Sequence, residues 1–376
     1  MKILIDINHP AHVHLIRNAY HELKAKGHEI IVTVKDIPSA QALMDSEGIP
    51  YINIGRKDDS LAKKGFDQLL YDWRIWKLVR KHKIELGIGS SINIAHVSRL
   101  SKMKSIILDD DDDAVEPLFV KYAHPFADVI LTPDSIQRKA KQTINYPGTH
   151  ELAYLHPRRF EPDAGILKEI GVKEGEKFFI VRFNAFKAHH DVGVKGLSIE
   201  GKRRLIKTLS QYGKVFITTE RNIDEEFLPY QLKVSQEKVH SLMYYATMFI
   251  GDSQTMTSEA AILGTPAVKC NSFAGRLAVP NELEERYGLC YAFLPEDEEK
   301  FHAKIEELVA MACEVKSEEG RAKSWNGLKA EWAKRREKFL EEKIDVTAFF
   351  VWMIENWPGS IEKARKGDDE FWKQFK

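Results

Sequence analysis

Cysteine is scarce in this sequence, and neither sign of charge is in excess. The 376 residues include three cysteines, which lie far apart and form no Cys-x-x-Cys pair. This odd number argues against a disulfide framework and favours buried thiols in a reducing compartment. Lysine and arginine together number 56, as do aspartate and glutamate, so the formal net charge is zero. The balance excludes a general attraction to nucleic acid or to acidic membranes, and we expect no nucleic-acid partner.

Long apolar runs are also missing. No stretch approaches the roughly 20 consecutive apolar residues that a membrane-spanning helix needs. The apolar start Met1–Ile5 is interrupted by Asp6 and is too short for a signal peptide. We therefore expect a cytoplasmic protein without a transmembrane segment, and peripheral association with a membrane stays open.

Strand and helix signals alternate along the first 150 residues. Lys2–Ile7 is apolar without alternation, as expected for a strand whose two faces are both buried in a parallel sheet. A helix to Lys26 and a strand at Ile30–Val34 complete a β-α-β unit. About seven strand segments before residue 150 predict one doubly wound, Rossmann-like domain. Further strands are expected at Tyr51–Ile54, Leu86–Gly89, Ser105–Leu108 and Val129–Leu131, with helices at Ser39–Ser46 and Phe66–His82.

A second alternating series follows the prolines and charged residues of His156–Gly175. Its strands are expected at Phe178–Phe183, Val215–Thr218, from Phe249 and at Leu289–Phe293, with helices at Ile199–Tyr212, Glu237–Ala246 and from Asp297. The chain exceeds the size at which one core keeps growing, and 43% of its residues are hydrophobic. We therefore predict two α/β domains, followed after Gly320 by amphipathic helices rich in aromatic residues.

The stretch Phe249–Cys270 has the clearest chemical signal. It consists of an apolar strand, a small polar loop, a short helix ended by Gly264 and a second apolar strand. The loop lies where an open α/β sheet places its ligand, and the helix N-terminus favours an anion such as phosphate. The loop residues are Gly251, Asp252, Ser253, Gln254 and Thr255.

Glu259 lies one helical turn beyond this loop, four residues after Thr255. A carboxylate at that position can accept hydrogen bonds from a ribose diol when the loop holds a diphosphate. A capping box does not explain Glu259, because Met256 stands where such a box needs Ser or Thr. The alternative is a solvated glutamate, with Ser253 as an ordinary N-cap.

The run Gly-Asp-Ser-x-x-x-x-Ser-Glu-Ala-Ala-x-Leu-Gly-Thr-Pro resembles the nucleotide-sugar motif of GT-B glycosyltransferases. It is also similar to the matching segment of the non-hydrolysing UDP-N-acetylglucosamine 2-epimerases. The resemblance implies that Ser253, Gln254 and Thr255 hold the donor diphosphate and that Glu259 holds the ribose.

The same resemblance implies a GT-B fold, in which two Rossmann-like parallel-sheet domains face a cleft and C-terminal helices cross back to the first domain. On this basis we expect residues 1–160 to form an acceptor-side domain and residues 161–343 a nucleotide-sugar-binding domain. Residues 344–376 are expected to be the helices that pack on the first domain.

The loop after the first strand carries His9, His12 and His14 close together. A histidine there can act as general base on an acceptor hydroxyl, because its pKa lies near the working pH, and Asp6 can orient it. The Asn-His-Pro-x-His pattern is similar to a family of uncharacterised predicted glycosyltransferases, which supports His12 and His9 as catalytic residues. Alternatively, His9 caps the following helix. We expect no metal pair, because no Cys or carboxylate cluster lies nearby in sequence.

Loops after other predicted strands carry further candidates. Asp109–Asp113 is a run of five carboxylates, for which a solvated loop is favoured over a Mg²⁺ site. The loop after Phe178–Phe183 offers cationic partners for a diphosphate, namely Arg182, Lys187, His189 and His190. At the end of the first domain, His150 and Glu151 are candidates for contacts to the sugar or the acceptor.

Together these features predict a glycosyltransferase that moves a sugar from a nucleotide-diphosphate donor, UDP by analogy, to an unknown acceptor. No cofactor is expected beyond the donor itself. The nearest alternative is an epimerase that resembles the UDP-N-acetylglucosamine 2-epimerases, uses carboxylates and needs no acceptor. A nucleotide-binding protein without catalytic activity is the other alternative.

Overall fold

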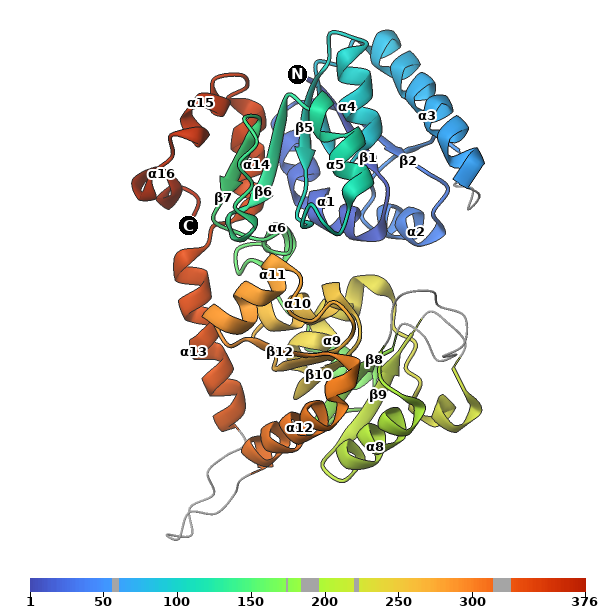
Figure 1. Ribbon diagram of the computed structural model, residues 1–376, viewed down its shortest axis with the longest axis vertical. Helices are drawn as coiled ribbons and strands as arrows, with labels where there is room; N and C mark the ends of the chain where they lie inside the picture. The colour runs from blue at the N-terminus through green and yellow to red at the C-terminus, as the bar shows by residue number, and fades with distance from the viewer. Residues whose placement is uncertain (56–60, 174, 184–195, 220–222, 314–325) are drawn as a thin grey trace. The chain divides into compact units, whose positions relative to one another are not determined.

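In the computed structural model, the polypeptide is described over residues 1–55, 61–173, 175–183, 196–219, 223–313 and 326–376 (Figure 1). The chain divides into two compact units. Unit 1 consists of Met1–Phe160 together with Lys343–Lys376, and unit 2 consists of Glu161–Glu342. Each unit is built on its own parallel β-sheet.

The sheet of unit 1 has seven parallel strands in the order β3-β2-β1-β4-β5-β6-β7. The chain starts in the middle of this sheet, winds to one edge through β2 and β3, and then fills the other side from β4 to β7. This is the doubly wound order that the alternating pattern predicts. The strands are β1 (Lys2–Ile7), β2 (Glu29–Val34), β3 (Ile52–Asn53), β4 (Leu86–Gly89), β5 (Lys104–Leu108), β6 (Val129–Pro133) and β7 (Thr143–Tyr146).

Helices connect these strands and bury the apolar faces of the sheet. The amphipathic patterns of the longer helices place one side on the protein interior and the other in solvent. They are α1 (Pro10–Ala25), α2 (Pro38–Ser46), α3 (Leu61–His82), α4 (Ile92–Arg99), α5 (Pro117–Tyr122), η1 (His124–Phe126), η2 (Asp134–Ile136) and α6 (Leu152–Leu155).

The C-terminal helices α14 (Val346–Glu355), α15 (Ser360–Arg365) and α16 (Asp369–Lys373) also belong to unit 1, as predicted. The Thr347 hydroxyl donates a hydrogen bond to the carbonyl of Ala153 at 2.7 Å. The rings of Phe349 and Phe350 pack on Tyr146, with centroids 5.6 and 5.9 Å apart. These buried contacts explain why the end of the chain returns to the unit that its beginning forms.

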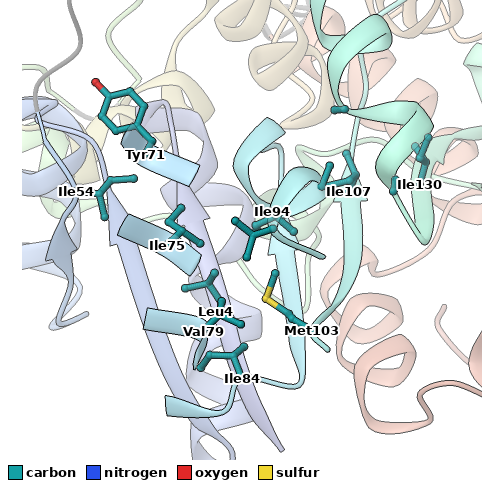
Figure 2. Packing of buried hydrophobic residues seen from close by; sticks show 14 residues of the cluster. Leu4, Ile54, Tyr71, Ile75, Val79, Ile84, Ile94, Met103, Ile107 and Ile130 are labelled. Atoms are coloured by element: carbon teal, nitrogen blue, oxygen red, sulfur yellow. The ribbon is translucent and has the colours of Figure 1, made fainter. Parts of the chain in front are cut away.

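One core of unit 1 lies between the sheet and helices α3 and α4 (Figure 2). Tyr71, Ile75 and Val79 of α3 face inward at intervals of four residues, and they meet Leu4 of β1 and Ile94 of α4. Ile75, Leu4 and Ile94 are completely buried. The spacing therefore places one side of α3 in the core and leaves the opposite side outside it.

Unit 2 has five parallel strands in the order β12-β11-β10-β8-β9. They are β8 (Phe178–Arg182), β9 (Lys214–Thr218), β10 (Met248–Gly251), β11 (Ala267–Cys270) and β12 (Cys290–Phe293). The helices are α7 (Gly165–Glu169), α8 (Ile199–Ser210), η3 (Glu225–Tyr230), η4 (Gln236–Lys238), α9 (Val239–Tyr245), α10 (Gln254–Ile262), α11 (Ala278–Asn281), η5 (Glu282–Arg286), η6 (Pro295–Asp297), α12 (Glu298–Cys313) and α13 (Asn326–Glu342). Within the described ranges of both units, no helix combines the length and apolarity that crossing a bilayer requires.

Several element ends differ from those predicted by the sequence. The strand predicted at Tyr51–Ile54 is reduced to Ile52–Asn53, and the helix predicted from Phe66 begins at Leu61. The strand predicted at Phe178–Phe183 ends at Arg182. The sequence pattern did not predict β7 and α4 as separate elements. Both are short, and pairing or packing with neighbours decides such elements more than local preference does.

We expect Ile75→Ala to lower the free energy of unfolding of unit 1 by about 2–5 kcal/mol, because it leaves a cavity in a fully buried cluster. The matched control is Leu69→Ala on the same helix, where the side chain is exposed and the effect should stay within about 0.5 kcal/mol. Chemical denaturation followed by circular dichroism measures both. Equal losses in the two variants would contradict the assignment of the two sides of α3.

Candidate functional site

The loop that follows β10 is fixed by close packing at the carboxyl edge of the unit 2 sheet. A side chain at Gly251 would collide with the carbonyl oxygen of Arg182, so only glycine allows β10 and β8 to approach this closely. The next amide, of Asp252, donates to that same carbonyl at 3.1 Å. Asn271, just beyond β11, donates its side-chain amide to the carbonyl of Asp252 at 2.9 Å. Three neighbouring strand ends therefore hold the loop in place.

Ser253 caps the N-terminus of α10. Its hydroxyl oxygen accepts a hydrogen bond from the amide of Met256 at 3.5 Å, and the Thr257 hydroxyl donates to the Ser253 carbonyl at 2.6 Å. Thr255 is exposed on the first turn. The first backbone N–H groups of a helix lack intrahelical acceptors, so this end of α10 presents donors and a positive dipole at the sheet edge.

Glu259 is buried and paired with a histidine that the sequence analysis did not single out. Its Oε1 lies 3.0 Å from Nε2 of His240 on α9, and both side chains are buried. The alternative that Glu259 is a solvated residue is therefore wrong. His240 gives no signal in the sequence, because its position on α9 beside α10 is a consequence of tertiary packing.

Buried Lys269 and half-buried Gln254 form a second pair at this edge. The ammonium of Lys269 donates to Oε1 of Gln254 at 2.6 Å, and burial lowers the pKa of Lys269 to about 8. Because an ammonium group has no acceptor, the Gln254 oxygen must face it, and Nε2 points the other way. That Nε2 atom is buried without a hydrogen-bond partner among the residues that the structure describes. The sequence could have indicated Lys269 as a functional residue, because it is the single lysine in the apolar strand Ala267–Cys270.

Other predicted donor-binding residues follow β8. Arg182 is the last residue of that strand and lies at the same edge of the sheet as the Gly251 loop. Lys187, His189 and His190 fall outside the described residues, and their predicted contact with a diphosphate stays a prediction.

The carboxylate of Asp6, at the end of β1, is bonded to donors from three segments of unit 1. The hydroxyls of Thr33 and Ser91 and the side-chain amide of Asn8 all donate to it. Burial raises the pKa of Asp6 despite these donors. The backbone amide of Asn8 in turn lies 3.4 Å from Nδ1 of His12. Asp6 is thus linked to His12 through Asn8 rather than by a direct hydrogen bond.

The two candidate histidines of this loop differ in their surroundings. His9 is exposed, and its Nδ1 accepts the amide of Ala11 at 3.2 Å, so it is the N-cap of α1. For His12, burial and the neighbouring His9 lower the pKa to about 3, which keeps the imidazole neutral at physiological pH. Since Nδ1 of His12 faces an N–H donor, the proton of the neutral ring lies on Nε2. In this state His12 is a hydrogen-bond donor.

The acidic run after β5 is not simply a solvated loop. Asp109 is buried, and its Oδ2 lies 2.6 Å from Nε2 of His124 and 3.0 Å from a guanidinium nitrogen of Arg138. Arg138 also pairs with Asp113 at 2.7 Å. The prediction of a solvated run is therefore wrong for Asp109, whose charge is compensated inside the unit. Among the described residues, no group of three or more His, Cys, Asp or Glu side chains is arranged to hold a metal ion.

Asp110 is paired with His150, which follows β7. The Oδ1 atom of Asp110 lies 3.0 Å from Nδ1 of His150. Burial disfavours the charged imidazole, but the hydrogen-bonded carboxylate of Asp110, together with the charges of Glu151 and Asp109, outweighs it and raises the pKa of His150 above 6.5. The other ring nitrogen, Nε2, is buried and has no hydrogen-bond partner within the described parts of the chain. This is the arrangement of an imidazole that one carboxylate orients and whose second nitrogen is available for proton transfer.

Glu151 adds a third titratable group to this edge. It is buried, and burial together with the nearby charge of Asp110 raises its pKa to about 7. The charges of Asp110 and His150 also act on His12. The carboxyl edge of the unit 1 sheet therefore gathers titratable groups from the loops after β1, β5 and β7, and among these Glu151 has a pKa near neutral pH.

Comparison with known proteins places the chain in a family. Residues 1–286 match the family model described as "Protein of unknown function (DUF354)". The chain belongs to this family. A curated relative, the uncharacterised protein MJ0665 of Methanocaldococcus jannaschii, is 23% identical over 295 residues, which cover 72% of this DUF354 chain and 82% of that protein.

Solved structures resemble the DUF354 chain over most of its length. The spinosyn forosaminyltransferase SpnP has a TM-score of 0.64 at 14% identity, and the similarity covers 94% of this chain and 98% of that one. The UDP-GlcNAc 2-epimerase of Methanocaldococcus jannaschii has a TM-score of 0.61 at 12% identity, covering 90% and 100%. Together with the two parallel sheets, these similarities show that the chain has the predicted GT-B fold.

We expect Asp110→Asn to move the titration of His150 to lower pH, because burial then acts on the imidazole without its hydrogen-bonded carboxylate. The pair stabilises unit 1 between pH 3.8 and pH 6.5. Above pH 3.8 Asp110 is ionised even in the unfolded chain, and below pH 6.5 His150 is protonated even in the unfolded chain. The stabilisation is lost as pH rises through the raised pKa of His150 or falls through the lowered pKa of Asp110.

Nuclear magnetic resonance of the imidazole signals measures the shift, with exposed His21 as the internal control. The loss of melting temperature in Asp110→Asn should be greatest between those two pH values. A His150 signal that titrates identically in the wild type and the variant would show that the pair does not form.

Proposed function

We propose that this protein is a glycosyltransferase that moves a sugar from a nucleoside diphosphate to an acceptor hydroxyl. The observation that carries the proposal is the N-terminus of α10 at the carboxyl edge of the unit 2 sheet, with the Lys269–Gln254 and His240–Glu259 pairs built around it. The names of the similar structures support it, since one is a sugar transferase and the other acts on a UDP-sugar.

In this proposal the loop at Ser253 binds the diphosphate. The N–H groups of the first turn of α10 that Ser253 does not cap, together with the dipole of the helix, favour an anion there. Gln254 has a buried Nε2 that points away from Lys269, and a phosphate oxygen supplies the acceptor that this atom lacks. Lys269 contributes positive charge close to the same place. These groups stabilise the charge that develops on the departing diphosphate during transfer.

Glu259 binds the ribose hydroxyls in the same proposal. His240 fixes Oε1 of its carboxylate, which sets the orientation of the group one turn behind the phosphate-binding loop. Ribose hydroxyls are donors, and a buried carboxylate accepts them with charge-assisted hydrogen bonds. Recognition of a nucleotide then needs both the phosphate-binding loop at the start of α10 and Glu259, one turn further along the helix.

We further propose that His150, oriented by Asp110, removes the proton of the acceptor hydroxyl. Its Nε2 has the free lone pair that a general base requires once the Nδ1 proton is held by Asp110. His12 was the base predicted from the sequence, but its Nδ1 is occupied and its pKa is low. We assign it a donor role toward an oxygen of the acceptor or the sugar, with Asp6 and His9 as the residues that shape its loop.

A second candidate function is epimerisation of a UDP-sugar without an acceptor. The observation that favours it is Glu151, a buried carboxyl group whose pKa of about 7 suits it to give and take a proton. Formation of an epimer from UDP-N-acetylglucosamine alone would support this function. Release of UDP only in the presence of an acceptor would support transfer. Tight nucleotide binding without turnover on any donor would support a non-catalytic role.

Uridine diphosphate should raise the melting temperature of the wild-type protein, because a ligand that binds only the native state stabilises it. Lys269→Met should weaken binding of the diphosphate about 10- to 100-fold, as expected for loss of a charge-assisted contact, and leave binding of uridine unchanged. Glu259→Gln should weaken both ligands, because it acts on the ribose. Isothermal titration with the two ligands separates these effects. If no nucleoside diphosphate of any base stabilises the wild type, the proposed donor site is wrong.

His150→Gln should reduce UDP release from a UDP-sugar by about 10²- to 10⁴-fold in the presence of an acceptor, the range typical of a lost general base. Nucleotide affinity should stay the same. The control is His21→Gln, an exposed histidine of the same unit. The wild-type rate should rise with pH through the pKa of His150, since only the neutral imidazole accepts a proton. If His12→Ala loses more activity than His150→Gln, the general base is His12, as predicted from the sequence, and not His150.

A further inference from the structure

Large apolar side chains are exposed on helices α3 and α5 of unit 1 and on the short segments beside them. They have relative exposures between 38% and 68%. The α3–α5 face is defined by these residues, which are Leu69, Trp73, Leu100, Leu118, Tyr122 and Phe126. Single exposed apolar residues are ordinary on protein surfaces, but six on neighbouring segments indicate an interaction surface.

Hydrogen bonds between the helices make this face continuous. His96 of α4 links both sides of it, because its Nδ1 lies 2.7 Å from Asp72 of α3 and its Nε2 lies 2.9 Å from the carbonyl of Tyr122. The His96 ring also meets the ring of Phe126 edge-on, with centroids 5.1 Å apart. The indole of Trp76 on α3 donates to the carbonyl of Leu100, just after α4, at 3.1 Å. Helices α3, α4 and α5 lie beside one another (Figure 1), and these contacts link the segments that carry the exposed residues.

The exposed residues of α3 are not displaced members of the core. Tyr71, Ile75 and Val79 occupy the buried side of the helix (Figure 2). Leu69 and Trp73, four residues apart, share a different side that is exposed. Leu118 and Tyr122 repeat this spacing on α5. Two helices thus each present an apolar pair to solvent.

Cations border the aromatic side chains of the face. The ammonium of Lys77 lies 3.6 Å from the centroid of the Trp73 ring, and Lys121 lies 5.4 Å from that of Tyr122. Arg80 lies 4.8 Å from the Trp76 ring. In residues 67–83 the lysines and arginines outnumber the aspartates by five to two, and one of those aspartates, Asp72, is already paired with His96. The segment before α5 is acidic, with Asp109–Asp113 and Glu116, so the basic border of the face lies along α3.

We propose that the α3–α5 face docks on the surface of a membrane that contains anionic lipids. Tryptophan and tyrosine favour the boundary between headgroups and acyl chains, and leucine side chains enter the apolar layer. Lysine and arginine at the border pair with anionic headgroups while their aliphatic stems cover apolar surface. A protein partner would need complementary acidic groups around an apolar centre, whereas a lipid surface supplies both without a specific sequence. This inference does not depend on the proposed function.

Sedimentation of the full chain with vesicles tests the proposal. The protein should bind vesicles of phosphatidylcholine with phosphatidylserine and bind phosphatidylcholine alone much more weakly. Lys77→Gln combined with Arg80→Gln should reduce binding roughly 30-fold, since each cation near an anionic surface contributes about a factor of five. Trp73→Ser combined with Leu118→Ser should abolish it. The matched control, Tyr212→Ser with Leu228→Ser, removes exposed apolar residues of unit 2 and should bind like the wild type.

All altered side chains are exposed, so thermal melting should confirm that each variant is folded. The proposal is overturned if the wild type binds neither vesicle, or if both face variants bind as the wild type does. It is also overturned if the face instead mediates self-association, which analytical ultracentrifugation would detect as an oligomer that both face variants lose in the absence of lipid.

Discussion

Parallel pairing of every strand is the constraint on which the rest of this structure depends. In a parallel sheet all strands point the same way, so the loops that follow them emerge at one edge. The first unit uses this rule to bring the segments after β1, β5 and β7 together, and the second uses it for the segments after β8, β10 and β11. The helices then have to cover both faces, which leaves the carboxyl edge as the place where polar side chains can gather.

Several of those gathered side chains are buried, and burial makes their pairing obligatory. An isolated charge in the interior costs several kcal/mol, so each is compensated locally. Asp109 meets Arg138 and His124, while Glu259 meets His240. Asp110 and His150 are different in kind, because this pair leaves a ring nitrogen of His150 unbonded within the described residues. We infer that the fully paired groups stabilise the structure, whereas the incompletely bonded ones take part in the reaction.

The same helices that close the sheet also create the outer surface of unit 1. Helix α3 fills the core with one side and exposes Leu69 and Trp73 on another. Its hydrophobic pattern is therefore wider than packing against a single sheet needs. If the face binds lipid and the sheet edge binds a sugar, the protein acts at the membrane surface. An acceptor located at that surface is then favoured. The two ideas are independent, and either can stand without the other.

Local sequence determined much of this protein. Apolar runs without alternation predicted the parallel strands, and Gly251 to Glu259 predicted a strand, loop and helix with the right order and position. These features depend on neighbours within a few residues, which the sequence displays directly. The predicted chemistry of individual side chains depended on more distant partners. The structure revised the Asp109–Asp113 run from a solvated loop to a partly buried network.

Only the tertiary structure decided which polar groups meet. Asp110 and His150 are forty residues apart and follow strands that β6 separates, so no periodicity links them. His240 reaches Glu259 because α9 packs beside α10, and Lys269 reaches Gln254 across the edge of β11. The physical reason is that hydrophobic spacing reports which way a side chain faces, whereas its partner is fixed by strand order and helix packing far along the chain.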